Sequence, residues 1–194
     1  MAIYIKISRN DISAIEKKFN IGKIISFNGI KKGIENTNYL LKTKYKKYIL
    51  TIFGKRVEKK DIPFFMNLMS RLKKYNINCP LPQKSKKGNY LFHIKNKPGV
   101  IVSFVDGKDK TKLSIKNCYD IGRHVAKLHN ASKKIKLYRK NSMSLSSWQK
   151  ILNKIGNRCK TIHPNLKELM KENLKDIKKK WPKNLSSGII HGDL

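Results

Sequence analysis

The sequence predicts an α+β protein in two parts, an antiparallel sheet of five strands interrupted by one helix and then a group of helices. Three observations support this prediction. Short segments rich in Ile, Tyr, Leu and Thr, bounded by turn residues, fill much of residues 1–105. Apolar residues at helical spacing dominate residues 106–194. Finally, 39% of the 194 residues are hydrophobic, which is enough for a buried core.

The first part begins with a short helix and a meander of three strands. Asn10 or Asp11 can cap the helix, because their side chains accept hydrogen bonds from a first helical turn, and Gly22 can end it. The strands follow at residues 24–30, 37–43 and 47–53, with turns at residues 31–36 and 44–46.

A second helix separates this meander from the last two strands. Asp61 caps the helix, Pro63 is tolerated in its first turn, and the apolar spacing ends near Tyr75. The last two strands are predicted at residues 90–94 and 100–105, which completes an antiparallel sheet of five strands.

The helical part starts after the turn residues Asp106 and Gly107, which we take as the boundary between a domain of residues 1–105 and one of residues 106–194. Ser114 caps its first helix, which runs to about residue 130. Two further helices carry tryptophans at core spacing, Trp148 and Trp181, and Pro182 stops the second of them.

The formal net charge of +33 and the pI of about 10.2 fit a partner that is acidic or a nucleic acid. However, nearly all the cations are Lys scattered through every segment, together with abundant Ile and Asn. A base-composition bias that fills exposed positions with Lys explains this pattern. We therefore expect no nucleic acid and no membrane as a partner, although a basic nucleic-acid-binding or anion-binding protein remains the alternative.

The cysteines indicate neither a disulfide framework nor a zinc site. Cys79, Cys118 and Cys159 are odd in number, far apart and in no CxxC pattern, so we expect buried thiols in a reducing compartment. No apolar run reaches membrane-spanning length, and the N-terminal residues lack the apolar stretch of a signal peptide. The expected location is the cytoplasm.

The final stretch, His191-Gly192-Asp193-Leu194, joins an imidazole and a carboxylate after a short apolar run. In protein kinases, a loop of the form His-x-Asp-Leu carries the Asp that orients the attacking hydroxyl and accepts its proton. Asp193 is therefore the candidate catalytic base, and His191 is expected to brace the loop. A solvated terminal tail also fits this tetrapeptide, so the rest of the chain has to decide.

Two stretches are candidates for holding a nucleotide. Gly33, Asn36 and Asn38 occupy the turn between the first two strands, where glycine permits close approach to phosphate and Asn side chains can hold the turn or contact the anion. Ser103 to Val105 close the sheet, where backbone groups can meet adenine. An ordinary hairpin turn and an ordinary strand end fit these stretches as well.

Thr51 departs from the protein-kinase pattern. The third strand of a protein kinase carries a Lys that pairs with the phosphates and with a Glu of the next helix. Here the strand carries Thr51, and the helix from Asp61 to Tyr75 contains no Glu. Phosphate charge must therefore be met by other cations, with Lys55 and Arg56 as the nearest candidates, or the site is of another type.

Together, these residues resemble homoserine kinase of the aminoglycoside-phosphotransferase-like superfamily. The likeness runs from the first strand to Leu194, and Thr51 looks like that family's own usage. The stretches that carry it are Phe27-Asn28-Gly29-Ile30, Gly33-Ile34-Glu35-Asn36-Thr37-Asn38-Tyr39, Tyr48-Ile49-Leu50-Thr51, Asp61-Ile62-Pro63-Phe64-Phe65, Pro80-Leu81-Pro82, Leu128-His129 and His191-Gly192-Asp193-Leu194.

The resemblance implies a protein-kinase-like bilobal fold, with an antiparallel five-strand N-lobe and an incomplete helical C-lobe. It also implies transfer of the γ-phosphoryl group of ATP to the hydroxyl of L-homoserine, a step of threonine biosynthesis. In this reading Asp193 is the catalytic base and Mg²⁺ supplies counter-charge. Another small-molecule kinase of the superfamily, acting on choline, an aminoglycoside or a sugar, is the alternative.

The sequence departs from the family in one respect. The family's catalytic loop continues to an Asn, and a later strand supplies an Asp; these two residues hold the metal, and neither occurs within the 194 residues. We therefore expect this chain to correspond to about the first three-fifths of a homoserine kinase, with the metal ligands beyond Leu194 and no activity of its own.

Overall fold

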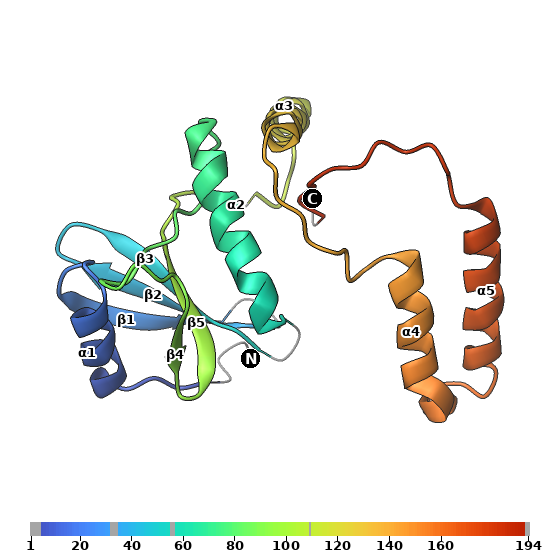
Figure 1. Cartoon of the computed structure of the whole chain (residues 1–194), viewed down its shortest axis with the longest axis horizontal. Coiled ribbons are helices and arrows are strands. Elements are labelled where there is room, and N and C mark those ends of the chain that lie inside the picture. Colours follow the sequence, from blue (N-terminus) through green and yellow to red (C-terminus); the bar gives the residue numbers. More distant parts are fainter. Residues whose placement is uncertain (1–4, 32–34, 55–56, 109, 193–194) are drawn as a thin grey trace. The chain divides into compact units, whose positions relative to one another are not determined.

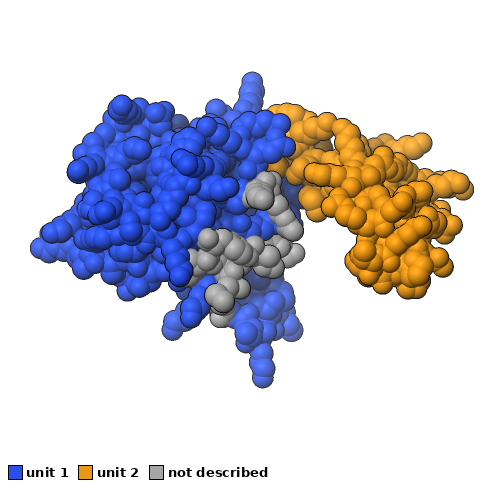
Figure 2. Space-filling view, turned by 90° about the horizontal axis from the view of Figure 1, so that it is seen from below, with its two compact units in different colours: residues 1–137, 189–194 blue, residues 138–188 orange. Residues whose placement is uncertain are grey.

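The computed structural model describes residues 5–31, 35–54, 57–108 and 110–192. The chain forms two compact units, one of residues 1–137 with 189–194 and one of residues 138–188 (Figure 2). We call them unit 1 and unit 2. The domain boundary expected between residues 105 and 106 stays a prediction.

Unit 1 contains one sheet of five strands, each antiparallel to its neighbours, in the order β1-β2-β3-β5-β4 (Figure 1). The predicted strands are confirmed with small shifts at their ends. Their bounds are β1 Ile24–Ile30, β2 Thr37–Thr43, β3 Lys47–Ile52, β4 Phe92–Ile94 and β5 Lys97–Ser103. Positive φ angles at Lys95 and Asn96 make the turn between β4 and β5 tighter than the sequence predicted.

Alternation along the strands gives the sheet two different faces. On one face Leu41, Leu50 and Ile101 are fully buried and pack with Ile12 and Ile15 of helix α1, Arg9–Lys18. On the other face Val100 and Val102 pack with Ile62 and Met66 of helix α2, Ile62–Lys74. Because successive residues of a strand point to opposite faces, α1 and α2 cover opposite sides of the sheet.

Helix α1 begins earlier than predicted. Its N-cap is Ser8, whose hydroxyl accepts a hydrogen bond from the backbone N–H of Asp11 while the Asp11 carboxylate accepts one from the Ser8 N–H at 2.7 Å. Asn10 and Asp11 are therefore not the cap. A capping box satisfies two backbone donors at once, so a helix start capped by Ser8 is more stable than one capped by Asn10 or Asp11.

Side chains of α1 also fix its position on β1. The guanidinium of Arg9 donates to the carbonyl of Ile24 at 2.8 Å, and the carboxylate of Glu16 accepts from the backbone N–H of Ile24 at 2.6 Å. Charge-assisted bonds of this kind are stronger than neutral ones. The first residue of the sheet is thus held by both of its backbone polar groups.

Helix α3, Ile115–Lys133, is confirmed, with Ser114 as its N-cap in a second capping box. Only its C-terminal half packs, where Ala131 and the following Ile135 join Leu72 of α2 in a small core. Ile115 is 92% exposed and Cys118 is exposed, so the expectation that Cys118 is buried was wrong. The apolar spacing predicted the helix but not which half of it is covered.

Unit 2 is a pair of helices, α4 Leu145–Ile155 and α5 Leu166–Lys180, joined through a short 3₁₀ helix at Gly156–Thr161. The two tryptophans predicted at core spacing pack edge to face, with the ring centroids of Trp148 and Trp181 5.9 Å apart. Neither lies in a buried core, since Trp148 is half-buried and Trp181 is 44% exposed. Leu152, Cys159 and Leu174 are the buried apolar residues of this unit.

Within the described ranges, none of the helices has both the length and the apolar character needed to cross a bilayer.

The capping box makes the stability of unit 1 depend on pH. Hydrogen bonds from Ser8, led by the one from its backbone N–H, hold the pKa of Asp11 below its ordinary value. A carboxyl whose pKa is lower in the folded than in the unfolded state stabilises the fold above its unfolded pKa. This stabilisation is lost as the pH falls through the folded pKa.

We therefore predict that Asp11→Asn lowers the free energy of unfolding of unit 1 by about 0.5–1 kcal/mol at pH 7. The difference from the wild type should be clearly smaller at about pH 3, because the stabilisation decreases as the pH falls from the ordinary Asp pKa through the lowered folded pKa. Urea unfolding followed by circular dichroism at both pH values measures this. Asp120→Asn, which removes an exposed carboxylate paired with Arg123, is the matched control. An equal difference at both pH values would contradict the account.

Candidate functional site

The candidate site of unit 1 is a group of four side chains in the middle of β2 and β3. Asn38 lies opposite Thr51 and Leu40 lies opposite Ile49, and all four are half-buried. Their strand neighbours Tyr39, Leu41, Leu50 and Ile52 face the buried α1 side. The four residues therefore share the α2 side of the sheet, and we call them the β2–β3 patch. Two apolar and two polar side chains in this order can hold a flat apolar group beside an anion.

The polar half of the patch is a hydrogen-bonded pair. The hydroxyl of Thr51 donates to Oδ1 of Asn38 at 2.8 Å. A hydroxyl has one hydrogen and an amide oxygen is an acceptor, so this bond leaves the Asn38 NH₂ group as a donor. Thr51 therefore orients Asn38.

Asn36 has the same kind of arrangement at the start of β2. Its Oδ1 accepts the backbone N–H of Gly54 at 3.1 Å. Since a backbone N–H can only donate, the oxygen of the amide must face Gly54 and the NH₂ group remains as a donor. The structure thus brings Asn36, Asn38 and Thr51 to neighbouring positions at one end of the β2–β3 pair.

Three other candidates near this end lie outside the described residues. They are Gly33 of the turn, and Lys55 and Arg56, which were expected to meet phosphate charge. Their assignments stay predictions.

The end of β5 borders a pocket of about 420 Å³ in unit 1. Ser103 is tied to Leu81, since its N–H donates to the Leu81 carbonyl at 2.9 Å and its Oγ accepts the Leu81 N–H at 2.8 Å. Val105 is 37% exposed, and none of the hydrogen bonds among the described residues uses its backbone N–H or C=O. Val105 can therefore offer both backbone groups to a ligand, whereas Ser103 is a fixed support.

Cys79 lines the same pocket. Burial raises the pKa of its thiol, with a smaller opposing effect of Lys73, and its S–H donates to the Met69 carbonyl at 3.5 Å. A thiol of raised pKa is a poor nucleophile at neutral pH. Cys79 is therefore a packing residue of this pocket and not a reactive group.

The stretch before the His-x-Asp motif is anchored on α3. The side chain of Ile189 packs against the core formed by Leu72 and Ala131. Its carbonyl lies 3.4 Å from the Ser132 hydroxyl, whose single hydrogen makes the shorter bond, 2.8 Å, to the His129 carbonyl. His191 itself is exposed and makes no hydrogen bond with the described residues. Asp193 lies outside the described residues, so its role as the base stays a prediction.

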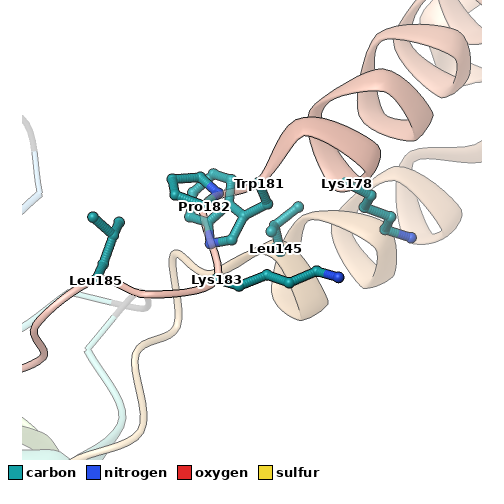
Figure 3. A pocket seen from close by; sticks show the side chains of 6 residues that line it. All are labelled: Leu145, Lys178, Trp181, Pro182, Lys183 and Leu185. Carbon is teal, nitrogen blue, oxygen red and sulfur yellow. The ribbon is translucent and has the colours of Figure 1, made fainter.

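Unit 2 has an open hollow of about 530 Å³ at the end of α5 (Figure 3). Trp181 and Pro182 form its apolar wall, and Lys178 and Lys183 flank it. The amino group of Lys178 donates to Gln149 at 2.8 Å. No carboxylate, thiol or imidazole lines this hollow, and its ionisable lining groups are the lysine amines of Lys178 and Lys183. The candidate chemistry therefore stays with unit 1.

Within the described ranges, no group of three or more His, Cys, Asp or Glu residues lies close enough together to hold a metal ion.

Sequence reasoning missed two residues of the site. Ser132 is a polar residue that is only 6% exposed, and a serine on the apolar side of a predicted helix could have indicated a buried hydrogen bond. Gly54 lies two residues after the end of β3, but its close contact with Glu35 depends on residues 19 positions apart in sequence. No local pattern indicates such a contact.

Comparison with known proteins places these features in a family. Residues 26–194 match the phosphotransferase enzyme family. The homoserine kinase of Rhizobium rhizogenes is 36% identical over all 194 residues of this chain, which cover 60% of that protein. The homoserine kinase of Mesorhizobium japonicum is 34% identical over the same 194 residues, covering 61% of it. The chain thus spans about three-fifths of the length of these relatives.

Solved structures share the fold. A spectinomycin phosphotransferase solved with ADP and spectinomycin aligns with a TM-score of 0.62 at 14% identity, over 92% of this chain and 60% of that one. An amicoumacin kinase solved in complex with AMP-PNP, Ca²⁺ and Ami aligns with a TM-score of 0.66 at 14% identity, over 97% of this chain and 59% of that one. The predicted protein-kinase-like α+β fold is confirmed, and the chain belongs to the phosphotransferase enzyme family.

Proposed function

We propose that this protein is a kinase that uses ATP to phosphorylate the hydroxyl group of L-homoserine. The observation that carries the proposal is the match of all 194 residues, at 34–36% identity, to proteins named homoserine kinase. The β2–β3 patch supports ATP as the phosphoryl donor. The assignment of L-homoserine as the acceptor is supported by the names of these relatives.

The adenine ring has a suitable surface in unit 1. Leu40 and Ile49 offer an apolar platform on the α2 side of the sheet, and adenine can lie flat on aliphatic side chains. Val105, at the end of β5, keeps a backbone donor and acceptor for the ring edge. ADP and AMP-PNP are the nucleotides in the two solved structures compared above, which supports a purine nucleotide here.

The phosphates would accept hydrogen bonds from side-chain amides in place of the lysine that protein kinases carry on the third strand. The NH₂ groups of Asn36 and Asn38 remain available because their oxygens already accept hydrogen bonds from Gly54 and Thr51. A hydrogen bond from a neutral amide to an ionised phosphate is charge-assisted, and two fixed donors orient the phosphate. Thr51 therefore acts in our proposal by orienting Asn38.

The proposed reaction needs one base and one acceptor. The homoserine hydroxyl oxygen forms a bond to the γ-phosphorus, the bond from that phosphorus to the β–γ bridging oxygen breaks, and ADP leaves. The hydroxyl proton passes to the carboxylate of Asp193, a role that rests on the His191-Gly192-Asp193 motif. Ile189, packed against Leu72 and Ala131, would hold this loop on α3.

Magnesium is the expected counter-ion of ATP in such a kinase. The described residues do not form a fitting set of ligands, so we assign none of them to the metal. The relatives are longer than this chain, and in our proposal the metal ligands follow the His-x-Asp-Leu motif.

Our first prediction for this site concerns Thr51. Thr51→Val keeps the shape of the side chain but removes the hydrogen bond to Asn38, so it should weaken binding of a fluorescent ATP analogue about three- to tenfold. Thr43→Val is the matched control, because Thr43 bonds only within the β2–β3 turn at the other end of the hairpin. Equal affinity of Thr51→Val and the wild type would exclude Thr51 from the site.

A second prediction concerns turnover. The 194-residue polypeptide should bind nucleotide without forming ADP in a homoserine-dependent manner, because we expect the metal ligands to follow the His-x-Asp-Leu motif. A coupled assay of ADP release, with and without L-homoserine, measures this. Turnover clearly above the blank would contradict the assignment of the metal ligands to residues outside this sequence.

A further inference from the structure

Gly54 follows the end of β3 and lies against the start of β2. A Cβ atom built on Gly54 would lie 2.3 Å from the backbone oxygen of Glu35 and 3.5 Å from its carbonyl carbon. Real Cβ atoms do not approach other heavy atoms to less than 3.0 Å. The atom in the way belongs to the backbone, so it cannot swing aside as the end of a side chain can.

Other glycines of the chain have no such constraint. A Cβ atom built on Gly22, Gly88, Gly107 or Gly122 would have no non-adjacent heavy atom within 4 Å. Gly54 also has no positive φ, so its backbone conformation is open to other residues. What requires glycine at position 54 is the close passage of Glu35.

The contact at Gly54 continues the pairing of β2 with β3 beyond its last backbone pair. That pair is Thr37 with Ile52. Thr37 is 2% exposed, and its hydroxyl accepts the backbone N–H of Ile5 at 3.3 Å. One residue earlier, Asn36 accepts the Gly54 N–H through its side chain. Residues 35–38 are thus held by contacts with Ile5, with β3 and with Gly54.

We propose that Gly54 is a positioning residue for nucleotide binding. Its missing side chain lets Glu35 pass, and its N–H fixes the amide of Asn36 so that the NH₂ group stays available to phosphate. This inference rests on the proposed function. Fixing the donor in the free protein removes an ordering cost that binding would otherwise carry.

The test uses Gly54→Ala and Asn36→Leu in the 194-residue chain, with Gly122→Ala as the matched control on α3. The probe is a fluorescent ATP analogue, and the second readout is hydrogen exchange at position 54 in the absence of nucleotide. We expect Gly54→Ala to bind the analogue at least tenfold more weakly than the wild type. Gly122→Ala should bind like the wild type.

Hydrogen exchange tests the contact independently of the nucleotide. Asn36→Leu removes the acceptor, so the Gly54 amide should exchange at least tenfold faster than in the wild type. Asn36→Asp keeps an oxygen acceptor and should retain the protection, although its negative charge should still weaken binding of the analogue. This difference separates positioning by Gly54 from the direct contact of residue 36 with phosphate.

The outcomes distinguish the two proposals. If the wild type does not bind the analogue, the proposed function fails, and exchange of the Gly54 amide alone decides whether the contact exists. If the wild type binds and Gly54→Ala binds equally well, the positioning role of Gly54 is overturned. Unchanged exchange in Asn36→Leu also overturns it. If Gly54→Ala does not fold, hydrogen exchange at position 54 in Asn36→Leu and Asn36→Asp still tests the positioning role of Gly54.

Discussion

Six residue pairs join β2 to β3, from Thr37 opposite Ile52 to Lys42 opposite Lys47, and the candidate site depends on this register. A shift by one residue would exchange the two faces of each strand. Leu41 and Leu50, now fully buried, would then lose their place in the core on the α1 side. The same packing therefore keeps Asn38 and Thr51 together on the opposite face.

The local chemistry of the site differs from the overall charge of the chain. A formal net charge of +33 creates a positive potential that attracts any polyanion, including ATP. Such a potential raises the encounter rate but does not orient the phosphates. Orientation in our account comes from neutral amides held by Thr51 and Gly54. A site with neutral donors at these positions should depend on a metal ion or another cation for most of its electrostatic stabilisation.

The order of elements could be predicted from sequence because it follows from local patterns. The strand segments, Ser114 as a helix cap and the end of α5 before Pro182 all depend on residues close in sequence. The start of α1 was predicted wrongly, since Asn10 and Asp11 both look like caps and only the reciprocal bonds with Ser8 decide between the options.

Contacts between distant residues could not be predicted in the same way. The pairing of Asn38 with Thr51 follows from the predicted hairpin, but their hydrogen bond depends on side-chain orientation. The passage of Glu35 over Gly54 and the packing of Ile189 against Leu72 and Ala131 depend on contacts that exist only in the folded chain. The exposure of Cys118 likewise depends on what packs on α3, which helical spacing does not indicate.

The central claim is that the nucleotide binds on the α2 side of the sheet, at the β2–β3 patch. Amide chemical shifts of the isotope-labelled 194-residue chain, recorded while AMP-PNP is added, test it most directly. We predict that the largest changes occur at residues 36–40, 49–54 and 103–105, and that α1 and unit 2 change little. Changes confined to α1 or to unit 2, or no saturable change, would contradict the account.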